Sequence, residues 1–197
     1  MDTLTQETRR RNTSGRQWCL FLDRDGVINT RIIDGYVRTW EQFAFEPGAL
    51  EALAVLAQWA PRIVVVTNQQ GVGKGLMTAA DLDDIHRRMR LEIEGAGGRI
   101  DDIRVCPHLV GADCDCRKPA PGMALSYLAQ HPEVDAALSV MVGDTESDIE
   151  MGRRLGARTG GTMTVRIDAV DDPHADVTFP TLAAFAAAAA GPDHSAE

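Results

Sequence analysis

Short apolar runs rich in β-branched residues alternate along the chain with segments of helical periodicity. The runs cover residues 18–22, 62–67, 103–105, 138–142 and 162–165. Continuous apolar runs of this length are typical of central strands in a parallel sheet, because such strands are buried on both faces. Helical patterns between strands indicate β-α-β units, so the sequence predicts a Rossmann-like, three-layer α/β fold with a doubly wound parallel sheet.

Helices are predicted between the strands and after the last one. Pro47 begins the first, and Thr78 caps the second. The third follows Pro121, the fourth ends at Gly156, and the last covers residues 182–190. Each carries apolar residues at helical spacing, so each can cover one face of the sheet.

Size and charge narrow the class of protein. The 197 residues fit one domain, predicted over 17–190 between disordered tails at 1–16 and 191–197. A net charge of −9 argues against general nucleic-acid binding. The basic cluster Arg9–Arg11 could contact phosphate groups, but a solvated tail is favoured. Because no membrane span or secretion signal is evident, we predict a cytoplasmic protein, with a monomer favoured.

Polar residues stand just after three of the predicted strands, where parallel sheets bind ligands. They are Asp23 and Asp25, then Thr67 and Asn68, then Asp144. Two carboxylates two residues apart point the same way in an extended chain. They suit Mg²⁺, or one can attack an electrophile while the other moves a proton. A solvated Asx turn is the alternative for this pair.

Further charged residues complete a pattern that suits phosphoryl transfer. Asp148 follows Asp144 after a second apolar strand, and Lys118 supplies a fixed positive charge. A carboxylate can approach a phosphate only if the repulsion between the two anions is cancelled. Mg²⁺ and a lysine can do this, while backbone amides and a hydroxyl such as that of Thr67 hold the equatorial oxygens.

A cluster of cysteines and one histidine predicts a metal site. Cys106, His108, Cys114 and Cys116 lie within eleven residues, with the spacing C-x-H-x₅-C-x-C. Three thiolates and one imidazole suit tetrahedral Zn²⁺, and four protein ligands make the site structural. Free cysteines without metal are the alternative. Cys19, inside the first strand, is predicted to be a core residue.

Four motifs give the chain a resemblance to a known family. FLDRDGVIN, VVVTNQ, CRKP and MVGDTESD resemble, in order, the four motifs of the haloacid-dehalogenase-like phosphatases, over roughly residues 17–167. The resemblance implies an aspartyl-phosphate mechanism, with Asp23 as nucleophile and Asp25 as general acid and base.

The same resemblance implies the binding residues. Thr67 and Lys118 hold the transferring phosphate, and Asn68 is placed in the same phosphate site. Mg²⁺ contacts Asp23, the backbone carbonyl of Asp25, and Asp144. Asp148 matches the second acid of the last motif.

The cysteine loop is similar to that of the heptose-1,7-bisphosphate phosphatases and of the histidinol-phosphate phosphatases. The run CDCRKPAPGM resembles the heptose enzymes more closely. The short x₅ gap departs from heptose enzymes with a long zinc loop and resembles the histidinol-phosphate enzymes and the short-loop heptose enzymes. The sequence therefore favours removal of the 7-phosphate of a heptose 1,7-bisphosphate, with histidinol phosphate as the alternative. A nucleic-acid-end phosphatase and a non-catalytic zinc-loop interaction module are remoter alternatives.

No insertion of domain size separates the motifs, so we expect an uncapped cleft whose rim charges select the substrate. Arg117, next to Lys118, could hold a second phosphate. Arg24 and Tyr36 are candidates for the same part of the substrate, with packing or surface roles as the alternative. Asp34, Glu41 and Glu46 could instead attract the cationic groups of histidinol phosphate.

Two weaker signals are interpreted as structural. Gly71–Gly75 departs from the nucleotide P-loop pattern and is predicted to be a flexible loop over the cleft, with Lys74 near the substrate. His86 is predicted to be a surface or helix-face residue and not a ligand.

Overall fold

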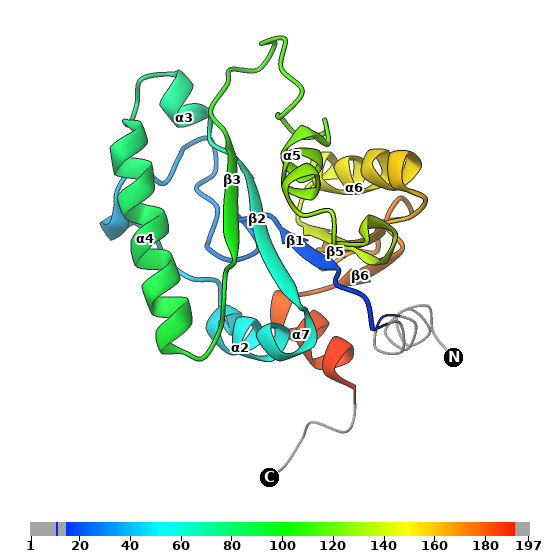
Figure 1. Ribbon diagram of the computed structural model, residues 1–197. Coiled ribbons are helices and arrows are strands. Elements are labelled where there is room, and N and C mark those ends of the chain that lie inside the picture. Colours follow the sequence, from blue (N-terminus) through cyan, green and yellow to red (C-terminus); the bar gives the residue numbers. More distant parts are fainter. Residues whose placement is uncertain (1–10, 12–14, 192–197) are drawn as a thin grey trace.

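The computed structural model describes residue 11 and residues 15–191, and its centre is a parallel sheet with the order β3-β2-β1-β4-β5-β6 (Figure 1). The strands are β1 (Cys19–Leu22), β2 (Arg62–Asn68), β3 (Asp102–Cys106), β4 (Val140–Gly143), β5 (Met163–Ile167) and β6 (Val177–Phe179). This is the order of a doubly wound sheet whose winding reverses between β1 and β4. The predicted α/β fold class is therefore confirmed.

Helices cover both faces of this sheet. They are α2 (Ala49–Trp59), α3 (Gln70–Gly73), α4 (Ala79–Gly95), α5 (Gly122–Gln130), α6 (Glu146–Thr159) and α7 (Leu182–Ala190). Leu20 and Leu22 of β1 pack in the core that includes α2, α4 and α7, whereas Phe21 packs with α5 and α6. Successive strand residues point to opposite faces, so one apolar run supplies both cores. Figure 1 shows α5 and α6 together on one side of the sheet.

Four short elements were not predicted, and two of them are 3₁₀ helices, Trp40–Gln42 and Ala136–Leu138. β6 has three half-buried residues and pairs only with β5 at the edge of the sheet. α3 is a four-residue helix directly after β2, so the prediction of a loop at Gly71–Gly75 was wrong for its first part. Elements this short carry too few residues to display a period.

The predicted end of the fourth helix at Gly156 was wrong. α6 continues to Thr159 and ends at Gly160, which has the left-handed φ of 89°. Gly156 serves a different purpose, because a Cβ there would lie 3.0 Å from the backbone nitrogen of Thr162. A glycine in a helix can thus mark a close backbone approach and not a helix end.

Most of the predicted tails, 1–10, 12–14 and 192–197, lie outside the described residues. Arg11 is described, and its Nε donates to the carbonyl of Leu138 at 2.7 Å. Arg16 pairs with Asp135 at 2.7 Å.

Two larger features are absent from the part of the chain that the structure describes. The motifs carry no cap of domain size between them, as expected. No helix there has the length and apolar character needed to cross a membrane.

Candidate active site

The loops at the carboxyl ends of β1 and β4 bring the predicted acidic residues together. Asp23 follows β1, and its backbone N–H donates to the carbonyl of Val142 in β4 at 2.9 Å. Its side chain is buried, and its Oδ1 accepts from the backbone N–H of Arg24 at 2.7 Å. Asp23, Asp144 and Asp148 each offer an oxygen within 4.8 Å of the others. The acids of both motifs therefore form one cluster.

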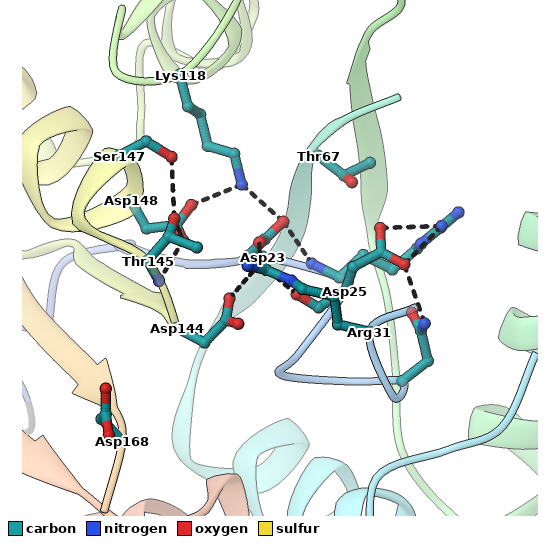
Figure 2. Close-up of polar contacts among 12 residues, drawn as sticks. Asp23, Asp25, Arg31, Thr67, Lys118, Asp144, Thr145, Ser147, Asp148 and Asp168 are labelled. Carbon is teal, nitrogen blue, oxygen red and sulfur yellow. Dashed lines mark hydrogen bonds and ion pairs between the residues drawn. The ribbon is translucent and has the colours of Figure 1, made fainter. Parts of the chain in front are cut away.

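Lys118 is the buried cation of this cluster. Its Nζ lies 2.6 Å from Asp23 Oδ1 and 2.6 Å from Asp148 Oδ1, so it bridges the two carboxylates (Figure 2). Burial opposes its charge, but the two carboxylates outweigh burial and raise the pKa of Lys118 above its ordinary value. Burial, and then repulsion from Asp148, raise the pKa of Asp23 to about 7. The cluster therefore needs positive charge to stay ionised.

Asp148 is held by its position at the start of α6. Its Oδ2 accepts from the backbone N–H of Thr145 at 3.0 Å, which completes a capping box. Its side chain is fully buried, so the helix start aims a carboxylate at Lys118 without solvent contact. In this structure Asp148 is a partner of the lysine.

Asp144 follows β4 and is the most exposed acid of the cluster. Its Oδ1 accepts from Arg31 Nη2 at 2.8 Å, and burial raises its pKa to about 6. Gly26, at φ 93°, lies so close that any side chain there would collide with the Asp144 carboxylate. The glycine of the first motif thus makes room for the acid of the last.

The carboxylate of Asp25 is surrounded by hydrogen-bond donors. Arg24 Nη2 donates to both oxygens at 2.9 Å, Asn29 Nδ2 to one at 3.0 Å, and Gln69 Nε2 to the other at 2.8 Å. Burial opposes ionisation, yet Arg24 and these donors hold the pKa of Asp25 below its ordinary value. The backbone carbonyl of Asp25 points elsewhere and accepts from Arg31 Nη2 at 2.9 Å.

For Arg24 the structure favours the packing alternative, and His86 lies on a helix face but is buried. Arg24 is fully buried, and its Nη1 lies 3.0 Å from His86 Nε2 on α4. His86 is 7% exposed, so the surface interpretation was wrong, although it does lie on a helix face. Burial, and then the charge of Arg24, lower the pKa of His86 to about 3. A neutral imidazole can therefore accept from Arg24 and help to fix the guanidinium beside Asp25.

The buried histidine leads to a prediction about acid stability. Folding favours the neutral form of His86, so His86 stabilises the fold at pH values above its unfolded pKa near 6.5. This contribution is lost as the pH falls toward the folded pKa of about 3. At pH 4.5 the loss is about 2–3 kcal/mol. His86→Gln retains an acceptor for Arg24 but cannot take up a proton. We expect its free energy of unfolding, measured with urea between pH 7 and 4.5, to fall less steeply than that of the wild type.

The end of β2 contributes two polar side chains, of which Asn68 lines the pocket and Thr67 does not. Thr67 Oγ1 accepts from Gln69 Nε2 at 2.8 Å, and Thr67 is buried. Asn68 makes two bonds to the backbone of Lys118: its Oδ1 accepts from the N–H at 3.1 Å and its Nδ2 donates to the carbonyl at 3.3 Å. Asn68 therefore positions the segment that carries the lysine.

The predicted cysteine and histidine ligands converge in the loop after β3, which rises beside α3 in Figure 1. His108 Nδ1 lies 3.2 Å from Cys116 Sγ and 3.6 Å from Cys106 Sγ, and Cys106 Sγ lies 3.9 Å from Cys114 Sγ. Tetrahedral zinc sites with ordinary bond lengths separate their ligand atoms by roughly 3.3–3.8 Å. A hydrogen bond from the backbone N–H of Arg117 lowers the pKa of Cys114, whereas burial raises the pKa of Cys106 and raises that of Cys116 to about 12. A metal cation among these sulfur atoms would favour the thiolate form of all three. These residues thus fit a zinc ion.

A pocket of about 490 Å³ is lined by Asp23, Asp25 and Lys118. Basic and aromatic side chains also line it, namely Arg31, Tyr36, Lys74 and Arg117. Tyr36 donates to Gln70 Oε1 at 3.2 Å, and Lys74 Nζ lies 5.3 Å from the centre of its ring. Arg117 Nη1 donates to the carbonyl of His108 at 3.3 Å, so the cysteine loop helps to place it. Of the three acids expected to attract a cationic substrate, Asp34 lines this pocket.

Sequence reasoning missed several side chains of the site. Arg31 contacts Asp144 and the carbonyl of Asp25, and Gln69 contacts both Asp25 and Thr67. Asn29 also donates to Asp25. Asn29 and Gln69 lie inside the stretches FLDRDGVIN and VVVTNQ, so proximity to a motif was the available signal. Arg31 lies in an irregular segment with no such signal.

A doubly wound sheet that gathers carboxylates, a buried lysine and a hydroxyl at its carboxyl edge defines an α/β enzyme of phosphoryl transfer. Residues 115–183 match the HAD-hydrolase-like family model. The chain is 48% identical over 176 residues to the D-glycero-alpha-D-manno-heptose-1,7-bisphosphate 7-phosphatase of Mycobacterium tuberculosis, covering 89% of this chain and 93% of the relative. It is 39% identical to the corresponding beta-heptose phosphatase of Pseudomonas putida, over 71% of this chain and 78% of the relative.

A solved structure supports the same relationship. The D,D-heptose 1,7-bisphosphate phosphatase of Bordetella bronchiseptica, complexed with magnesium and phosphate, superposes with a TM-score of 0.76 and 31% identity, covering 86% of this chain and 96% of the other. This chain belongs to the haloacid-dehalogenase-like (HAD) hydrolase family. It is a phosphatase, a hydrolase of phosphoric monoesters.

Proposed function

We propose that the chain removes the 7-phosphate of D-glycero-D-manno-heptose 1,7-bisphosphate. The observation that carries this proposal is the 48% identity to a heptose-bisphosphate phosphatase over nearly the whole of both chains. The pocket supports this proposal because it offers positive charge for each of the two phosphates. Lys118 lies beside Asp23 for the reacting phosphate, and Arg117 and Lys74 line the same pocket for the second one.

The alpha anomer is the proposed form of this sugar. The M. tuberculosis relative named for the alpha-heptose is 48% identical to this chain, whereas the P. putida relative named for the beta-heptose is 39% identical. Steady-state kinetics with both anomers tests this choice, and we expect the higher kcat/KM for the alpha form.

In the proposed mechanism Asp23 is the nucleophile. Its carboxylate oxygen forms a bond to phosphorus while the bond from phosphorus to the sugar oxygen breaks. Asp25 is ionised while Arg24 and Gln69 donate to it, so it must first exchange these donors for the leaving group and take up a proton from solvent. It then gives that proton to the sugar oxygen. Asp25 then takes a proton from water, the water oxygen attacks phosphorus, and the bond to Asp23 breaks. Phosphate leaves and both aspartates return to their starting state.

Three oxygens of Asp23, Asp25 and Asp144 fit a magnesium ion. Asp144 Oδ1, the carbonyl of Asp25 and Asp23 Oδ2 lie 2.8, 2.9 and 3.8 Å from one and the same nitrogen, Nη2 of Arg31. Three oxygens that converge on one point form the donor set of a hard cation. When bound, Mg²⁺ would offset the repulsion between the phosphate and the carboxylates. Lys118 and Thr67 are proposed to hold the transferring oxygens, with Asn68 positioning Lys118.

Substrate preference is the test of this function. We expect kcat/KM for the heptose 1,7-bisphosphate to exceed that for histidinol phosphate at least about 10-fold, because the latter offers cationic groups to Arg117. Arg117→Ala should shrink the ratio mainly by lowering the rate with the bisphosphate. Arg87→Ala, on the exposed face of α4, is the matched control and should leave the ratio unchanged. An equal or reversed preference would favour histidinol phosphate instead.

A structural zinc ion in the cysteine loop is proposed and has its own prediction. Cys114→Ser removes one thiolate of four ligands, so elemental analysis of the purified variant should find zinc falling toward zero. Hydrogen exchange should rise in residues 107–117, which lead directly to Lys118. Cys19→Ala, in β1, is the control and should retain the zinc. Wild-type protein purified without chelator and found free of zinc would contradict this proposal.

A further inference from the structure

Arg31 places a positive charge at the point where the oxygens of the proposed metal site converge. Its Nη2 donates to Asp144 Oδ1 at 2.8 Å and to the carbonyl of Asp25 at 2.9 Å, and lies 3.8 Å from Asp23 Oδ2. Figure 2 shows its side chain reaching across the two aspartates of the first motif toward Asp144. The guanidinium therefore occupies the same contacts that a divalent cation would need.

The three cations of the site differ in how firmly they are held. Arg24 is fully buried, and the side chain of Lys118 is 2% exposed between two carboxylates. The side chain of Arg31 is 36% exposed, against 7% for Asp23 and 17% for Asp144. Arg31 thus approaches the acids from the solvent side, and it is the cation most free to leave.

The segment around Arg31 is irregular and is anchored at its far end, where Val37 is buried and Tyr36 donates to Gln70. Residues 31–38 form neither helix nor strand, and Ile33 within them is 78% exposed. The described side-chain bonds of Arg31 all end on the acidic cluster and on the carbonyl of Asp25. If those contacts are replaced, the side chain can turn back into the pocket that it also lines.

A metal ion and this guanidinium exclude each other. Mg²⁺ binds oxygen at about 2.0–2.1 Å, so an ion among these oxygens would be in contact with a nitrogen only 2.8–2.9 Å from two of them. Both species are cations, and they would repel at that distance. Every contact that Arg31 makes here must be given up before a metal can bind, which weakens metal binding by the free energy of those contacts.

We propose that Arg31 is a displaceable internal cation that competes with the divalent metal ion for Asp144, the Asp25 carbonyl and Asp23. The inference rests on the metal site of the proposed function. In the metal-free protein Arg31 neutralises the acidic cluster; in the metal-bound protein it is released. Arg31 thereby sets the metal affinity without being a ligand.

The test measures metal binding directly, with Mn²⁺ as the probe, by calorimetry on protein dialysed against metal-free buffer without chelator, so that the cysteine site keeps its metal. Arg31→Gln keeps a polar side chain of related shape and removes the charge. We expect it to bind Mn²⁺ at least about 10-fold more tightly than the wild type. Arg38→Gln removes an exposed arginine from the same segment and should stay within about 2-fold of the wild type, which controls for net charge. In the absence of metal, Arg31→Gln should unfold at a lower temperature than the wild type, and added Mg²⁺ should raise its unfolding temperature by more.

The outcomes separate this inference from the proposed metal site. Asp144→Asn tests the metal site itself, and it should bind no Mn²⁺ in the concentration range that saturates the wild type. If Asp144→Asn binds normally, the metal site is wrong and the inference falls with it. If Asp144→Asn loses binding but Arg31→Gln binds Mn²⁺ no more tightly than the wild type, the site stands and only the displaceable cation is overturned.

Discussion

Replacing Asp23 by asparagine is expected to lower kcat for phosphate-ester hydrolysis at least about 10³-fold. The amide has nearly the size of the carboxylate but lacks an anionic oxygen to attack phosphorus. Neither Lys118 nor Asp25 can substitute for that oxygen, because one is a cation and the other is held by Arg24. Initial rates with an aryl phosphate and with the heptose bisphosphate, both with Mg²⁺, measure the loss.

The fold should survive this change, which makes the result interpretable. Asp23 belongs to a cluster of three carboxylates within 4.8 Å, so removing its charge relieves repulsion on Asp144 and Asp148. Lys118 keeps Asp148 as its partner. We therefore expect an unfolding temperature within a few degrees of the wild type. Asp84→Asn, on the exposed face of α4, is the matched control and should keep full activity. Full activity of purified Asp23→Asn would overturn the aspartyl-phosphate mechanism.

The strands and the acids at their ends could be predicted from the sequence for a physical reason. A strand buried on both faces must be apolar throughout, so β2 displays an uninterrupted Ile-Val-Val-Val run. The first polar residue after such a run marks the carboxyl edge of the sheet. Asp23 and Asp144 were located in this way, and both lie at that edge.

The partners of those acids could not be located by the same reasoning. Arg31 comes from a segment without periodicity, so nothing in the local pattern says which way its side chain turns. His86 lies on a helix whose apolar face includes Ile85 and Met89, and a polar residue beside such a face is usually solvated. It is buried because Arg24, far away in the sequence, supplies a hydrogen bond that only the folded chain creates.

Replacing Lys118 by methionine is expected to have the second large effect, on stability as well as on rate. The substitution leaves the fully buried Asp148 and the 7% exposed Asp23 facing each other without their shared cation. Removing one partner of a buried ion pair costs about 3–5 kcal/mol, because the remaining charge is uncompensated. Urea denaturation should show this loss, and kcat should fall at least about 10²-fold because the phosphate loses its fixed positive partner.

An exposed lysine provides the matched control for the buried Lys118. Lys74→Met removes a lysine that is exposed over the ring of Tyr36, and its free energy of unfolding should stay within about 0.5 kcal/mol of the wild type. A loss as large as that of Lys118→Met would mean that methionine itself, and not the buried carboxylates, is the cause.

The double variant Asp23→Asn with Lys118→Met tests the physical reason directly. If the single lysine variant is unstable because two carboxylates face each other, neutralising one of them should restore part of the lost stability. We expect the double variant to be more stable than Lys118→Met alone by at least about 1 kcal/mol, which is a coupling of the size found for groups in contact. Strictly additive losses would show that Lys118 does not stabilise the fold through Asp23 and would leave Asp148 or the packed methylene groups as the cause. Because the nucleophilic oxygen is already absent from the double variant, only stability is informative there, and the expected activity is no higher than that of Asp23→Asn.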